Sequence, residues 1–173
     1  MTATANALRK ALTTNSTATS FTAKNATTTK PSGAGIFDLL AVDVNVSSQG
    51  MAKFIQLIPF GTNGDNDTFD MQLWGWSKTT DTTPVWVPQL LVELNVVLCA
   101  ATQGEADTYL ADTLTIAKGD ADASKISPAG TSNFVASILV HLRGCELIEF
   151  EFDLAGGQEA VSCNSYWRLV DQS

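Results

Sequence analysis

The sequence contains no acidic residue before Asp38. Its first 37 residues hold four basic side chains, whereas residues 38–173 hold six basic residues and all 18 acidic residues. The two parts therefore carry formal charges of +4 and −12, which combine to the net charge of −8. The basic residues of the first part are Arg9, Lys10, Lys24 and Lys30.

This distribution of charge limits the partners that the protein can have. Binding to phosphate groups needs a face rich in Lys and Arg, which an acidic body does not offer. We therefore expect no direct contact with nucleic acid. We expect the basic segment to dock on an acidic protein surface, and every copy of the body provides one.

The sequence has few of the residues that enzymes use. Its one histidine, His141, lies in an apolar run, and its three cysteines form no C-x-x-C pair. A nucleophile motif of the form G-x-S-x-G, a phosphate-binding loop and a dinucleotide fingerprint are absent. We predict no enzymatic activity and no cofactor. We interpret His141 as a structural side chain with satisfied hydrogen bonds. We interpret Cys99, Cys145 and Cys163 as small buried apolar residues, and one disulfide with a leftover thiol is the alternative.

Long apolar runs are also missing. Residues 85–101 form the longest one, and Pro88, Gln89, Glu93 and Asn95 interrupt it, so we expect no membrane span. Residues 1–20 lack the apolar core of a secretory signal. An acid-free, Ser/Thr-rich beginning is also typical of an organelle transit peptide, which remains an alternative.

Residues 1–35 form a low-complexity segment, and we predict that it is a docking arm. Residues 6–12 are predicted to make about two helical turns, with Leu8 and Leu12 on one face. The Thr-rich run from 13 to 29 favours an extended chain, which can add a strand to an open sheet edge. The expected anchors of the arm are Leu8, Arg9, Lys10, Leu12 and Phe21.

Residues 36–173 are predicted to form a single domain. Apolar residues recur there with a period of two, which indicates strands, and turn-rich segments separate the runs. We predict an all-β fold, an antiparallel β-sandwich or jelly-roll-like body of about eight strands. Pro88 implies a bulge or an edge position in its strand. The expected strands span 36–46, 53–60, 68–77, 84–99, 110–116, 134–142, 147–154 and 162–170.

Trp74, Trp76 and Trp86 are the most unusual side chains of the body. Trp74 and Trp76 share a strand face, and Trp86 follows after one loop, so pairing of the two strands would bring all three together. A tryptophan platform of this kind binds sugars or a protein partner. The competing interpretation is packing in the core or between subunits.

Two sets of acidic residues have spacings that are found in metal-binding or catalytic sites. Asp65, Asp67 and Asp70 resemble a calcium-binding loop, but Asp70 stands where such a loop requires glycine, so a turn is favoured over a weak Ca²⁺ site. Glu149 and Glu151 alternate along one strand, as a pair of glycosidase carboxylates does. The same alternation is typical of the solvent-facing side of a half-buried strand, and we favour that interpretation.

Several segments together resemble the structural proteins of tailed-bacteriophage virions, of the head-decoration or minor-capsid type. These are the short start at Asn6–Leu12, the Thr/Ala-rich arm, the run Leu73-Trp74-Gly75-Trp76 before a polar loop and Trp86, and the strand within Gly144–Asp153. The resemblance implies a homo-oligomeric β-sandwich located in the virion and made in the host cytoplasm.

The leading hypothesis is therefore a non-enzymatic virion structural protein. It would assemble with copies of itself and with other virion proteins through its arm and its sheet faces. Deletion of residues 1–35 is expected to leave a folded body that no longer assembles. The alternative hypothesis is a lectin-like or receptor-binding β-sandwich that uses the tryptophan cluster.

Overall fold

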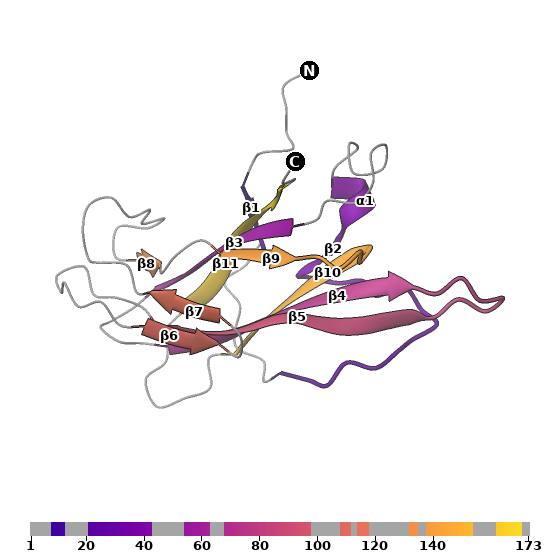
Figure 1. Ribbon diagram of the computed structural model, residues 1–173, viewed down its shortest axis with the longest axis horizontal. Coiled ribbons are helices and arrows are strands. Elements are labelled where there is room, and N and C mark those ends of the chain that lie inside the picture. Colours follow the sequence, from indigo (N-terminus) through magenta and orange to yellow (C-terminus); the bar gives the residue numbers. More distant parts are fainter. Residues whose placement is uncertain are drawn as a thin grey trace, which may run out of the picture.

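The fold is an all-β sandwich of two antiparallel sheets (Figure 1). No helix in the described part of the chain is long and apolar enough to cross a membrane. The computed structural model describes residues 8–12, 21–42, 54–62, 68–97, 108–111, 114–117, 132–134, 138–153 and 162–170.

The first sheet, sheet A, has the strand order β1-β11-β3, and two short strands, β8 and β9, pair in succession with the other edge of β3. The two short strands share one position, so sheet A is four strands wide. Its strands are β1 (Arg9–Lys10), β11 (Ser162–Val170), β3 (Phe54–Thr62), β8 (Ser132–Phe134) and β9 (Ile138–His141).

The second sheet, sheet B, has the order β2-β10-β4-β5. Two short strands form a separate ribbon, and a four-residue helix, α1 (Leu39–Val42), follows β2. The strands of sheet B are β2 (Ile36–Asp38), β10 (Leu147–Asp153), β4 (Thr68–Lys78) and β5 (Trp86–Val97), and those of the ribbon are β6 (Thr108–Ala111) and β7 (Leu114–Ala117).

The strand pairs are nested along the chain. When the inserted strands β6, β7 and β8 are set aside, the first strand pairs with the last, the second with the second-last and the third with the third-last, around the β4–β5 hairpin. Successive pairs belong to sheet A and sheet B in turn. This is the connectivity of a jelly roll, and it confirms the predicted fold class.

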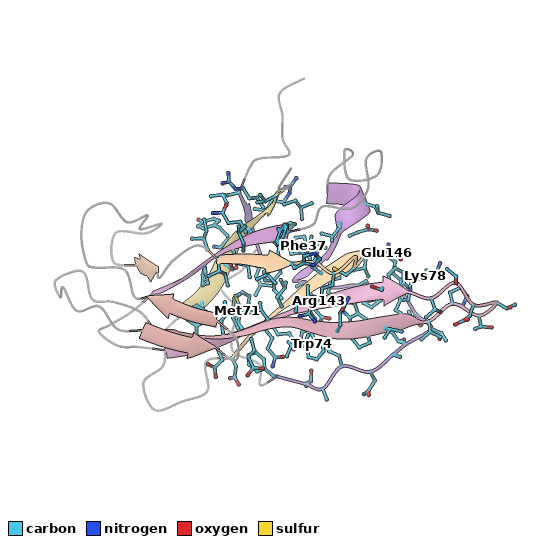
Figure 2. All side chains as sticks on the ribbon, in the orientation of Figure 1. Phe37, Met71, Trp74, Lys78, Arg143 and Glu146 are labelled. Atoms are coloured by element: carbon cyan, nitrogen blue, oxygen red, sulfur yellow. The ribbon has the colours of Figure 1, made fainter. Side chains whose placement is uncertain are left out.

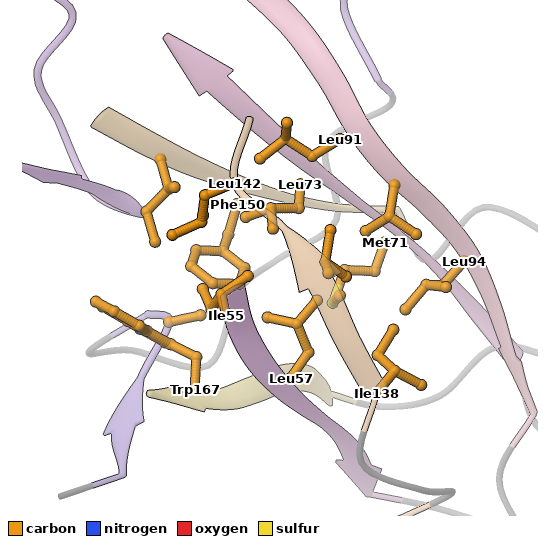
Figure 3. Close-up of a cluster of buried hydrophobic side chains, with 14 of the residues drawn as sticks. Ile55, Leu57, Met71, Leu73, Leu91, Leu94, Ile138, Leu142, Phe150 and Trp167 are labelled. Carbon is orange, nitrogen blue, oxygen red and sulfur yellow. The ribbon is translucent and has the colours of Figure 1, made fainter. Parts of the chain in front are cut away.

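The core lies between the two sheets and follows from the period of two (Figure 3). Ile55 and Leu57 of β3 point inward from sheet A, while Met71 and Leu73 of β4 and Phe150 of β10 point inward from sheet B. All are buried, because inward positions of both sheets interdigitate in a sandwich.

Aromatic rings close the edge of the sandwich at which β1 and β2 lie. The Phe37 ring of β2 makes an edge contact with Trp167 of β11, with ring centroids 4.9 Å apart. Phe37 also packs edge-on against Phe150, at 6.0 Å. The contact with Trp167 connects β2, the outermost strand of sheet B, with β11 of sheet A.

Pro88 lies in β5, the outermost strand of sheet B, and a register shift falls between Leu73 and Trp74 of the neighbouring β4. The edge position is one of the two alternatives predicted from the proline, which has no N–H to donate to a ladder. The register shift lies further along β5, where Leu73 and Trp74 pair with Val92 and Leu90. The strands expected near 53–60, 68–77, 147–154 and 162–170 are confirmed within a few residues. The expected strand 110–116 is instead the β6–β7 ribbon, and 134–142 is divided into β8 and β9.

Two predictions about local structure were wrong. The expected helix at 6–12 is extended where it is described, because Arg9 and Lys10 pair with Trp167 and Tyr166 of β11. Pairing with a sheet edge outweighs the weak helical preference of so short a segment. The expected strand 36–46 ends at Asp38, whose carboxylate Oδ1 accepts the Leu40 N–H at 3.0 Å and so begins helix α1.

Gly75 is needed where β4 crosses the core. A Cβ atom at this position would lie 3.0 Å from both Cβ and Sγ of Cys145 and 3.1 Å from Cδ1 of Leu91. We expect Gly75→Ala to lower the free energy of unfolding by about 1–3 kcal/mol through overpacking. Urea denaturation measures this change. Ser77→Ala, on the same face of the same strand, is the control, and equal stability of both variants would contradict the packing.

Candidate functional site

The N-terminal arm is attached to the body at two places, and the first is the edge of sheet A. Beyond the β1–β11 pairs, the Ala11 N–H donates to the Ser165 carbonyl oxygen at 2.8 Å. The Leu12 N–H donates to Oδ1 of Asn164 at 3.1 Å, and Nδ2 of Asn164 donates back to the Leu12 carbonyl at 3.2 Å. The arm therefore supplies the outermost strand of the sheet.

Side chains of the arm also enter the core at this edge. Ala11 is 1% exposed, and Leu12 packs against the core cluster. The Arg9 guanidinium carbon lies 5.6 Å from the centroid of the Trp167 ring, which is a cation–π distance. The edge strand is thus held by backbone pairing, apolar burial and a charge–ring contact together.

The second attachment is a segment that we call the strap, residues 21–30. It follows the outer side of sheet B beside β5, as the extended dark-purple trace in Figure 1 shows. Thr27 and Trp86 form an antiparallel bridge: the Thr27 N–H donates to the Trp86 carbonyl at 3.0 Å and the Trp86 N–H donates to the Thr27 carbonyl at 2.7 Å. The strap therefore pairs with the open edge of sheet B.

Lys24 is the main polar contact of the strap. Its ammonium group lies 2.7 Å from Oε1 of Glu149 and also donates to Oε1 of Glu151. All three side chains are at most 14% exposed. Burial alone would lower the pKa of Lys24, but the hydrogen bonds and negative charges of the two carboxylates outweigh it and raise this pKa above its ordinary value.

Lys30 holds the other end of the strap. Its Nζ lies 2.6 Å from Oδ2 of Asp38 and 5.9 Å from the centroid of the Trp86 ring. The hydrogen bond from Lys30 lowers the pKa of the Asp38 carboxyl, and the N–H groups of Leu40 and Ala41 act in the same direction. The pair is partly exposed, so it contributes little to stability.

Beneath the strap lies an apolar cluster on the outer face of sheet B. Trp76, Trp86 and Leu147 are 4%, 6% and 0% exposed, although a solvated outer face would leave them open to water. The indole N–H of Trp76 donates to Oε2 of Glu149 at 2.8 Å. We call Trp76, Trp86, Leu147, Glu149 and Glu151 the seat of the strap.

Trp74 lies beside the seat on the side of sheet B that faces the strap, and it is only partly buried (Figure 2). Its indole N–H donates to Oε1 of Gln72 at 2.9 Å, and Nε2 of Gln72 donates to Oε2 of Glu93 at 2.6 Å. The structure thus brings the three predicted tryptophans to one face, with two of them buried and one accessible.

The predicted anchors of the arm occupy different environments. Leu8 is 43% exposed, Lys10 is exposed opposite Tyr166, and Phe21 is half-buried at the start of the strap. Arg9 and Leu12 contact the body as described above. The sequence predicted that this segment docks on an acidic protein surface, but it did not single out Lys24.

The weak calcium candidate lies mostly outside the described residues. Asp65 and Asp67 are not described, and Asp70 lies within β4 opposite Asp153 and Asn95. In the described part of the chain, no group of three His, Cys, Asp or Glu side chains is arranged to hold a metal ion.

His141 and two of the cysteines have structural environments. Nδ1 of His141 accepts the Arg143 N–H at 2.8 Å, and the imidazole packs edge-on against Phe54 with centroids 5.1 Å apart. Cys145 and Cys163 are buried and form no disulfide, whereas Cys99 lies outside the described residues.

No protein-family model, curated protein or solved structure matches this chain.

Lys30 determines the titration of Asp38. A lowered folded-state pKa gives a stabilising contribution that is present above the ordinary value of 3.8 and is lost as the pH falls through the folded-state pKa. We expect Lys30→Met to move the pKa of Asp38 upward, measured by NMR titration of its carboxyl carbon. Lys78→Met is the control and should leave it in place. An unchanged pKa in the Lys30 variant would contradict the contact.

Cys145 is expected to be unreactive in the folded protein. Burial raises the pKa of its thiol to about 12, so almost no thiolate is present near neutral pH. At pH 8, iodoacetamide should modify Cys145 only after unfolding, which peptide mapping by mass spectrometry measures. Modification of the native protein at the rate found in denaturant would show that the thiol is not buried.

Proposed function

We propose that this protein is a non-enzymatic structural protein of a virion, a capsid decoration, cement or minor capsid subunit. It assembles with copies of itself and with other virion proteins through its N-terminal arm and its sheet faces. The observation that carries this proposal is the edge strand β1, which comes from the arm and is held on β11 largely through the backbone.

Backbone pairing at a sheet edge is a general way to join chains. The N–H and C=O groups of an edge accept any extended strand, and side-chain pockets then select the partner. In and just after β1, these selective contacts are Arg9 over Trp167 and Leu12 against the core. An arm with these contacts favours a function in which the protein attaches to other chains. Many weak contacts of this kind, repeated over a lattice, add up to strong binding.

The distribution of charge supports copies of the chain as partners. The strands of sheet A contain three basic residues and no acid, whereas those of sheet B contain six acids and one basic residue. Opposite charges on two sides of one subunit favour contacts between unlike faces of successive copies. The charged residues are Arg9, Lys10 and Arg168 in sheet A, and Asp38, Asp70, Lys78, Glu93, Glu149, Glu151 and Asp153 in sheet B.

The jelly-roll connectivity is also found in other proteins whose functions are relevant to both hypotheses. Jelly rolls of eight strands recur in viral capsid proteins and also in lectins, so the fold agrees with both hypotheses and does not choose between them. The choice rests on the arm, since a sugar-binding module does not require one.

A second candidate function is favoured by Trp74. It is partly exposed beside Gln72 and Glu93, and an aromatic ring next to a carboxylate and an amide suits a sugar. Trp76 and Trp86 are buried and do not contribute. Trp74→Ala should then abolish glycan binding on an array without lowering the unfolding midpoint, and an array on which the unchanged protein shows no signal removes this function.

Variants at Leu8 and Leu12 distinguish an effect on assembly from an effect on folding. Because Ala11 and Leu12 belong to the core, deleting residues 1–35 would remove core packing as well as docking contacts, and point variants are more informative. Leu8→Ser should weaken self-association by about tenfold or more with unchanged stability, since Leu8 is largely exposed in the isolated subunit. Leu12→Ala should lower the free energy of unfolding by about 1–2 kcal/mol.

Sedimentation velocity measures the association, and urea denaturation measures the stability. If Leu8→Ser associates as strongly as the unchanged protein, the arm does not assemble through this side chain. If the unchanged protein shows no association with its own copies at any concentration, assembly of copies is wrong.

A further inference from the structure

We propose that in the assembled protein the strap of one copy docks on the seat of a neighbouring copy, so that Lys24 of one subunit lies between Glu149 and Glu151 of the next. This inference rests on the proposed function, because it needs assembled copies, and it names the surface on which the arm binds. The occupant is a second copy of this chain, presenting residues 21–30.

The seat recognises the strap by its chemistry. Two carboxylates, Glu149 and Glu151, stand on one face of β10, and only a cation between them relieves their repulsion. Trp86 offers its ring to a second cation, Lys30, and its backbone to one extended residue, Thr27. The site therefore recognises an extended segment with two lysines that are six residues apart, and the arm of every copy contains such a segment.

The arm of one copy can make its contacts on the body of another copy. Residues 8–12 pair with β11, and residues 21–30 pair with β5 and bind β10. These contacts are non-covalent and join the arm to the body. The arm of a neighbour could make the same set, because exchange of an identical element replaces each contact by its equivalent and requires no new surface.

A short connection joins the strap to the body. Ser32, Gly33 and Ala34 are exposed, and a Cβ at Gly33 would meet no atom within 4 Å, so this turn is not packed. Gly33 and Gly35 have φ angles of 143° and 82°, which suit glycine. Gly35 stays with the body, because its carbonyl accepts the Phe150 N–H at 3.0 Å. Residues 31–34 are therefore the hinge, and opening it releases the arm as a unit.

Zero-length cross-linking tests the exchange on the unchanged protein. A carbodiimide joins an amine to a carboxylate only when the two are in contact, as Lys24 and Glu149 are. Equal amounts of isotope-labelled and unlabelled protein are mixed, assembled and cross-linked, and the Lys24–Glu149 and Lys24–Glu151 peptide pairs are examined by mass spectrometry. We expect about half of these pairs to combine the two isotopes, because arms and seats in an equal mixture combine at random.

The outcomes separate the inference from the proposed function. Assembled protein in which every Lys24 cross-link joins peptides of the same isotope overturns the exchange and leaves assembly intact. Protein that neither associates nor forms mixed pairs overturns both. The control is Lys24→Arg, which keeps the positive charge but has no reactive amine. It should assemble normally and lose both cross-links.

Charge reversal gives an independent readout. One variant carries Lys24→Glu in the strap, and another carries Glu149→Gln with Glu151→Lys in the seat, where the amide of the first substitution still accepts the Trp76 indole N–H. Each alone should associate about tenfold more weakly than the unchanged protein, and their equal mixture should recover most of that loss. The chain with all three substitutions should also recover. Recovery in that chain but not in the mixture shows that the strap binds only its own body.

Discussion

Sheet B carries large apolar side chains on both of its faces, and this constraint determines much of the structure. Along β4, Phe69, Met71 and Leu73 point into the sandwich, while Trp74 and Trp76 point to the other side. Sheet A can cover only one of these faces. The other would expose the rings of Trp76 and Trp86 and the side chain of Leu147 to water, at a cost of roughly 1.5–3 kcal/mol for each large side chain. The strap is the element that covers them.

The strap has little apolar surface of its own, so it is held by a different means. Lys24 satisfies two carboxylates that would otherwise repel each other beside the rings, and Thr27 uses backbone groups that the outer edge of β5 leaves open. Polar contacts fix the position of the segment, and the position excludes water from the rings. The same division holds for β1, where backbone pairs fix the strand and Ala11 and Leu12 fill the core.

The sequence predicted the fold class well, because a period of two is a local signal that survives in the folded chain. It located the edge position of Pro88 and the meeting of Trp74, Trp76 and Trp86 on one face. It did not predict that Leu8–Leu12 would be extended or that a helix would follow Asp38, since a sheet edge and a capping carboxylate decide these points.

Only some features of the seat could be predicted from the sequence. Taken alone, the alternation of Glu149 and Glu151 indicates a solvent-facing strand surface, which is wrong, because their partner Lys24 lies 125 residues away from Glu149 in the chain. An isolated Lys in a Thr-rich arm gives no indication of which carboxylate it meets. The sequence does show that a basic arm is joined to an acidic body. In the structure, the ion pairs of Lys24 with two glutamates of the body are one result of this difference in charge.

The central claim is that the strap, residues 21–30, is an ordered cover of sheet B. Hydrogen exchange at the Thr27 and Trp86 amides of the full-length protein tests it most directly, because each of these N–H groups donates to the carbonyl of the other residue. We expect both amides to exchange far more slowly than in an unstructured peptide. Exchange of both at the unstructured rate would show that the strap is not seated and would contradict the account.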